Sequence, residues 1–73
     1  MTLEEKLALL TETIEAEPGE LKPEVPLDEL EMWDSLAKLS VLAMFSAKFN
    51  REIEIDKVRA FSVVDDILSE MHE

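Results

Sequence analysis

The segment Leu36–Phe49 constrains the fold most, because ten of its fourteen residues are apolar. Its only charged residues are Lys38 and Lys48. The spacing predicts a helix from about Ser35 to Phe49. The residues expected to enter the core are Leu36, Leu39, Leu42, Phe45 and Phe49. A helix packed on one side needs a narrower apolar stripe than this, so either it is buried on most sides or a partner docks on its outer face.

The length of 73 residues predicts a single domain spanning 1–73, because so short a chain cannot form two cores. The apolar fraction of 47% is that of a globular protein. There is no cysteine, so disulfides and thiolate metal sites are excluded and a reducing compartment is tolerated. No apolar run has membrane length and no signal peptide opens the chain. We expect a cytoplasmic protein.

The net charge of −11 restricts the classes of partner. It argues against nucleic acid, whose phosphates attract Lys and Arg, and against anionic membrane surfaces. Basic partner proteins are the natural inference, because complementary charge speeds encounter. The alternative is that the charge only keeps the protein soluble and monomeric.

A first helix is predicted to begin at Thr2, which is followed by Glu5 at the spacing of a capping box. Its expected apolar face is formed by Leu3, Leu7, Leu10 and Ile14. Pro18-Gly19 is expected to end it.

The stretch from Glu20 to Trp33 is irregular, since Pro23 and Pro26 forbid a regular helix early in it. Its apolar residues, predicted to anchor a long ordered loop on the core, are Val25, Leu27 and Leu30. Between Glu12 and Asp34 there are nine acids and one base. Their spacing does not match a calcium-binding loop, which needs a glycine at its sixth position, so no dedicated metal site is expected.

The C-terminal part is predicted to hold a short helix from Asp56 to Ala60 and a last helix capped by Ser62 and Asp65. Ile53, Ile55, Val58 and Phe61 are expected to face inward, and the last helix to present Val64, Ile67, Leu68 and Met71. The expected fold is all-α, a small four-helix bundle of three longer helices and one short helix.

Ser35 is the most informative polar residue, because it stands where the central helix begins. Backbone N–H groups there lack intrahelical partners and the helix dipole is positive, which suits a phosphate. The alternative is that Asp34 or Ser35 is only an N-cap. A serine nucleophile needs a base, but the only histidine, His72, lies at the far end of the chain. The single glycine excludes a phosphate-binding glycine loop, so no enzyme activity is expected.

Asp34-Ser35-Leu36 at the start of the second helix resembles the modification motif of acyl carrier proteins. The similarity extends over nearly the whole chain, in the order of the helices and the long loop, in length and in acidity. The other matching stretches are Leu27-Asp28-Glu29-Leu30, Ile53-Glu54-Ile55 and Ser62-Val63-Val64-Asp65. The resemblance implies an acyl-carrier-protein-like fold.

By this resemblance, a phosphopantetheinyl transferase attaches 4′-phosphopantetheine to Ser35 and Asp34 helps to present the serine. The arm would carry acyl groups as thioesters to acyl-transferring and synthase enzymes of fatty acid, polyketide, modified-lipid or peptide synthesis. The partner surface is expected on the outer face of the second helix, at Leu36, Lys38 and Ala43. Carriers of fatty acids tend to place acids along this helix, whereas this chain has Lys38 and Lys48, which favours a specialised carrier. The alternative function is a helical adaptor that is never modified.

Overall fold

The computed structural model describes residues 1–73 and begins with helix α1, Leu3–Ile14. The predicted capping box is confirmed: the Thr2 hydroxyl accepts from the Glu5 N–H at 3.1 Å, and the Glu5 carboxylate accepts from the Thr2 N–H at 2.8 Å. The proximity of Thr2, first through its backbone N–H and then through its side chain, lowers the pKa of Glu5. Helix α1 therefore begins where the sequence predicts.

The buried face of α1 lies in its second half. Leu10 and Ile14 are buried, and Leu7 is half-buried. Leu3 was expected in this face but is 52% exposed, because the first turn extends beyond the elements that cover the rest of the helix. The helix ends at Glu15, whose left-handed conformation (φ 57°) stops it before the predicted Pro18-Gly19.

Helix α2 spans Ser35–Phe49, which confirms the predicted bounds. Its buried residues are Ala37, Val41, Met44, Phe45 and Phe49. The prediction that Leu36 and Leu39 face the core is wrong, since they are 70% and 55% exposed, and Leu42 is half-buried. The exposure of Leu36 agrees instead with its expected place on the outer face of the helix. Apolar residues occur almost all round this helix, so spacing alone does not select the buried face; packing against α1 does.

The long connection between α1 and α2 is pinned to the core, as predicted. Leu27 and Leu30 are buried, Val25 is half-buried against the core, and a short 3₁₀ helix, η1, covers Leu27–Glu29. An isolated antiparallel bridge joins Pro26 to Val63.

Three backbone hydrogen bonds of 2.9 Å hold this connection against the chain that leads into the last helix. They run from the N–H groups of Leu27, Val64 and Asp65 to the carbonyls of Ser62, Val25 and Pro23, respectively.

Helices α3, Ile55–Ala60, and α4, Val64–Leu68, complete the fold. Val58 is buried as expected. The predicted cap at Ser62 and Asp65 is displaced by one residue, because the Asp66 carboxylate accepts from the N–H groups of Val63 (3.0 Å) and Ser62 (2.7 Å), and these bonds lower the pKa of Asp66. Since α4 has only five residues, the fold has two long and two short helices, not three longer and one short.

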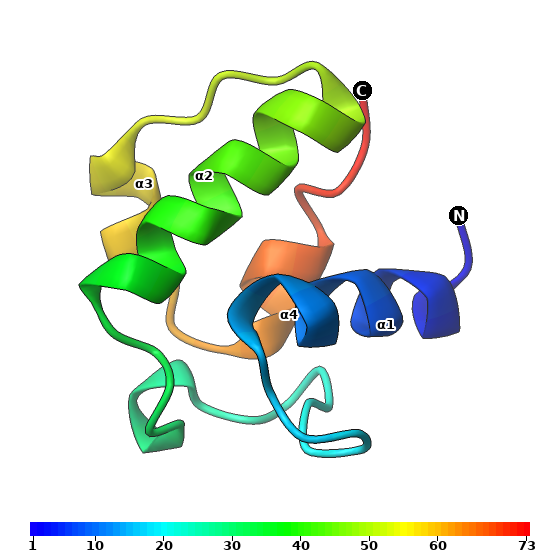
Figure 1. Cartoon of the computed structure of the whole chain (residues 1–73), viewed down its shortest axis with the longest axis vertical. Helices are drawn as coiled ribbons and strands as arrows, with labels where there is room; N and C mark the ends of the chain where they lie inside the picture. Colours follow the sequence, from blue (N-terminus) through cyan, green and yellow to red (C-terminus); the bar gives the residue numbers. More distant parts are fainter.

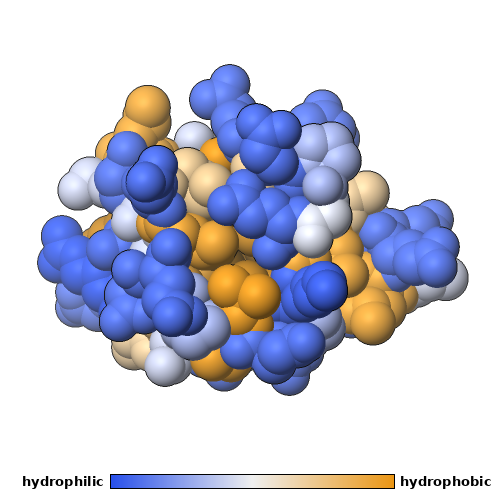
Figure 2. Space-filling model, turned by 90° about the horizontal axis from the view of Figure 1, so that it is seen from below, coloured by the Kyte–Doolittle hydropathy of each residue, from blue (hydrophilic) through white to orange (hydrophobic).

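Figure 1 shows α2 lying diagonally across the molecule, with α1 and α3 packed against it and α4 behind. The two termini lie on the same side. The domain is all-α, without strands, and no buried side chain is polar or charged. Seen from the side of the long connection, apolar atoms show between hydrophilic side chains (Figure 2). No helix has both the length and the apolarity that a bilayer crossing requires.

Candidate functional site

Asp34, not Ser35, is the N-cap of α2. The Asp34 carboxylate accepts a hydrogen bond of 2.9 Å from the Ala37 N–H, and its carbonyl accepts one of 3.0 Å from the Lys38 N–H. The Ser35 hydroxyl has no hydrogen-bond partner in the protein, and the residue is exposed. The capping role is therefore filled by Asp34, and the Ser35 hydroxyl is not needed for it.

The first turn of α2 also leaves backbone donors free. The N–H groups of Ser35 and Leu36 precede the first intrahelical bonds, and neither donates to a backbone carbonyl. Together with the positive end of the helix dipole they favour a negative group beside the serine.

A small pocket of about 140 Å³ opens next to Ser35, between α2 and α3. It is lined by Ser35, Lys38, Leu39, Ile55 and Arg59. Two cationic side chains therefore line the same small pocket as Ser35. Arg59 has one acidic neighbour, Asp56 at 3.6 Å, and both side chains are largely exposed, so this pair is weak.

Trp33 lies near the same two cationic side chains, Lys38 and Arg59. It is half-buried and packs against the core. The Lys38 ammonium group lies 5.9 Å from the centre of its ring. A second pocket of about 460 Å³ is lined by Trp33, Lys38 and Arg59, with Asp28 and Phe61 beside them.

The residues expected to form the partner surface divide between two sides of α2. Lys38 lies on the α3 side with Ser35. Asp34 and Leu36 line a pocket of about 420 Å³ shared with the C-terminal end of α1, and Ala43 also borders α1 residues. Leu39 was expected in the core, although helical spacing places it on the same face of α2 as Ser35. Ile55 and Arg59 were not predicted as neighbours of Ser35, because no local pattern shows how α3 packs on α2.

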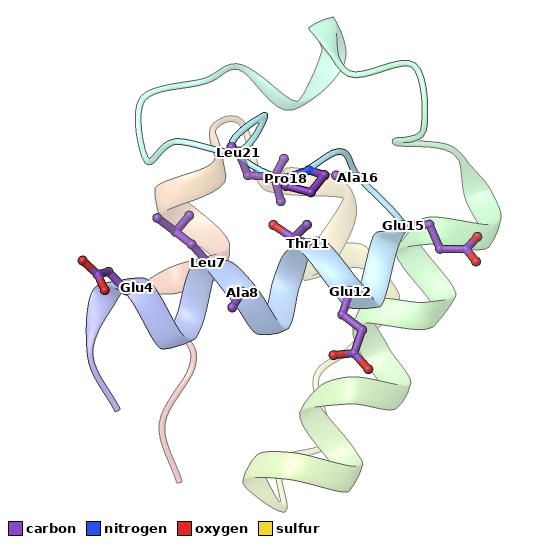
Figure 3. A pocket seen from close by; sticks show the side chains of 10 residues that line it. Glu4, Leu7, Ala8, Thr11, Glu12, Glu15, Ala16, Pro18 and Leu21 are labelled. Atoms are coloured by element: carbon purple, nitrogen blue, oxygen red, sulfur yellow. The ribbon is translucent and has the colours of Figure 1, made fainter.

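The largest pocket is separate from this site. It measures about 660 Å³ and runs along α1 beside the turn that contains Pro18 and Gly19. In Figure 3, Leu7 and Leu21 approach each other across it, while Glu4 and Glu12 point outward. It shares no residue with the pocket beside Ser35.

The acids of the long connection have no cationic partners. The ion pairs are Arg51–Glu70 (2.9 Å), Lys57–Glu70 (3.1 Å) and the weak Arg59–Asp56 pair, and none involves an acid between Glu12 and Asp34. No group of three or more His, Cys, Asp or Glu side chains is arranged to hold a metal ion.

No protein family model matches the chain, and neither a curated protein nor a solved structure matches it.

Proposed function

We propose that the protein is an acyl carrier whose Ser35 hydroxyl accepts 4′-phosphopantetheine from coenzyme A. The observation that carries the proposal is the free, exposed hydroxyl of Ser35 on the first residue of α2, within the sequence Asp34-Ser35-Leu36. The Ser35 oxygen would form a bond to the pantetheine phosphorus as the pyrophosphate P–O bond of coenzyme A breaks. Adenosine 3′,5′-bisphosphate leaves, and the transferase takes the hydroxyl proton.

The residues around Ser35 suit the phosphodiester that this reaction would leave there. The free N–H groups of Ser35 and Leu36 are potential donors, and Lys38 and Arg59 line the adjacent pocket. The bound arm supplies a thiol for thioester formation, a group that this cysteine-free chain lacks.

A transferase is required, because no base of this chain stands at Ser35. The only histidine, His72, is exposed near the C-terminus, with its Nε2 atom 3.5 Å from the Arg51 guanidinium. Asp34 is engaged with the Ala37 N–H. The chain would thus be the substrate of modification and then a carrier, working in the cytoplasm with acyl-transferring and synthase enzymes of fatty acid, polyketide, lipid or peptide synthesis.

The test is to incubate the protein with coenzyme A, magnesium and a broad-specificity phosphopantetheinyl transferase, and then to weigh it. We expect the mass to rise by one phosphopantetheine group. Ser35→Ala must abolish the gain, and Ser46→Ala, an exposed serine of the same helix, must not. An unchanged mass of the wild-type protein under conditions that modify a known carrier would refute the proposal.

The second candidate is an unmodified helical adaptor, which the exposed leucines Leu36 and Leu39 favour. An adaptor needs these side chains but not the Ser35 hydroxyl. Modification at Ser35 therefore separates the two functions.

A further inference from the structure

The charges of this protein are segregated between two parts of the fold. Residues 35–51 contain no acid, although the chain has 18. Residues 35–64 hold three acids and five of the seven bases. The five bases are Lys38, Lys48, Arg51, Lys57 and Arg59. The net charge of −11 therefore comes entirely from the rest of the chain.

Two of the five bases, Lys38 and Arg59, lie next to Ser35. Glu70 neutralises part of the basic set, because it pairs with both Arg51 and Lys57. Lys38 and Lys48 form no ion pair, but Lys48 lies near the other end of α2. Arg59 pairs only with the exposed Asp56, and Asp28 lines a neighbouring pocket with Lys38 and Arg59 without an ion pair to either. Lys38 and Arg59 line the pocket beside Ser35 together with the apolar side chains of Leu39 and Ile55. We call Lys38, Leu39, Ile55 and Arg59 the cationic face.

The cationic face also has the composition of a contact surface. Its two apolar residues differ in exposure: Leu39 is 55% exposed and Ile55 is half-buried. An exposed apolar centre with charged groups at its edge is the arrangement of protein interfaces. Rim charges of this kind set the orientation and the rate of association.

We propose that the cationic face binds a partner protein through a patch of acidic side chains around an apolar centre. This inference deepens the carrier function proposed above and rests on it, since a partner docked there would lie beside the arm on Ser35. It revises the expectation of basic partners, which treats the charge of −11 as uniform. The unpaired acids of residues 12–34 would repel such a partner from the surface that they occupy.

An extended anionic surface fits less well than a local acidic patch. The molecule measures 26 × 26 × 18 Å, so a nucleic acid or a bilayer in contact with the cationic face would also approach the unpaired acids of residues 12–34. A partner protein, in contrast, can carry its acidic side chains only in the region that contacts the cationic face.

The test uses two helical peptides with the same leucine positions, one with Glu and one with Lys at every polar position. Each is titrated to millimolar concentration into the ¹⁵N-labelled protein, unmodified or carrying Ser35→Ala. We expect the Glu peptide to shift the amide signals of Lys38, Leu39 and Arg59. The Lys peptide should act instead on residues 12–34. Binding of the peptide does not require the Ser35 hydroxyl. The titration can therefore be interpreted even if the modification assay fails, and the modification assay can be interpreted even if the titration shows no binding.

Charge reversal supplies the matched control. The double variant Lys38→Glu with Arg59→Glu should raise the Kd of the Glu peptide about tenfold, which corresponds to about 1.4 kcal/mol of binding free energy. Lys6→Glu with Lys22→Glu changes the net charge by the same amount away from the cationic face, and should raise this Kd much less. Circular dichroism checks that both variants are folded.

Three outcomes would overturn the inference. In the first, the Glu peptide causes no shifts of the amide signals. In the second, the control variant weakens binding of the Glu peptide as much as the variant at Lys38 and Arg59 does. In the third, a single-stranded oligothymidylate or anionic vesicles produce the same shifts more strongly. The last outcome would assign the cationic face to nucleic acid or lipid.

Discussion

The division of roles between Asp34 and Ser35 predicts two very different alanine variants. Asp34→Ala removes the acceptor of the Ala37 N–H, a bond of 2.9 Å. Loss of an N-cap of this kind costs about 1 kcal/mol, which corresponds to a fall of about 4–8 °C in Tm for a domain of this size. Ser35→Ala removes a hydroxyl without a partner, so the free energy of unfolding should change by less than about 0.5 kcal/mol.

Thermal and urea unfolding followed by circular dichroism measure both variants under one set of conditions. Asp34→Asn is the matched control, because its side-chain oxygen can still accept from the Ala37 N–H. It loses only the charge at the helix N-terminus, worth about 0.3–1 kcal/mol. If Ser35→Ala destabilises the protein as much as Asp34→Ala, the Ser35 hydroxyl is a structural group and the assignment of a free hydroxyl is wrong.

Three further predictions concern packing, pH and salt. Leu36→Ala should change the free energy of unfolding by less than about 0.5 kcal/mol, since the side chain is 70% exposed. Val41→Ala, at a fully buried position, should lower it by about 2 kcal/mol. If urea unfolding gives equal losses for the two variants, Leu36 is buried and the prediction is wrong. Hydrogen bonds from Lys57 and then Arg51 lower the pKa of Glu70 from its ordinary 4.5 in the folded state, so its stabilisation is present above pH 4.5 and is lost as pH falls through the lowered value. Glu70→Gln should therefore be less stable than wild type at pH 7, by about 1 kcal/mol or less per ion pair, and this gap should close in acid, whereas a gap independent of pH would contradict the ion-pair assignment. Added salt or millimolar magnesium should raise Tm, because the acids of residues 12–34 have no cationic partners, and a Tm indifferent to both would mean that they do not repel one another appreciably.

Local patterns predicted the helices better than the faces they bury. The bounds of α2 and the capping box of α1 follow from nearest neighbours along the chain, and the structure confirms both. The buried face of α2 depends on which side α1 covers, and this is a tertiary choice. Ala37 and Val41 are buried, while the larger Leu36 and Leu39 are left outside.

The candidate site was predicted only in part for the same reason. Ser35 and its position at the helix start are visible in the sequence, because the apolar run begins just after it. Arg59 is far from Ser35 in sequence, and only the packing of α3 on α2 brings both to one pocket. The cap was ambiguous between Asp34 and Ser35 until the bond to the Ala37 N–H identified it.

The three backbone bonds between the long connection and the start of α4 have a mechanical consequence. They join residues 23–27 to residues 62–65, so that α2 and α3 lie inside a loop whose two ends are fastened together. Tension applied to the two ends of the chain passes from the connection directly into α4 through these bonds. Helix α1 also packs on α4 and shares the load. The backbone from residue 28 to residue 61, which includes Ser35, thus bears no tension along the chain itself until these bonds break, although α1 still contacts α2 through its side chains.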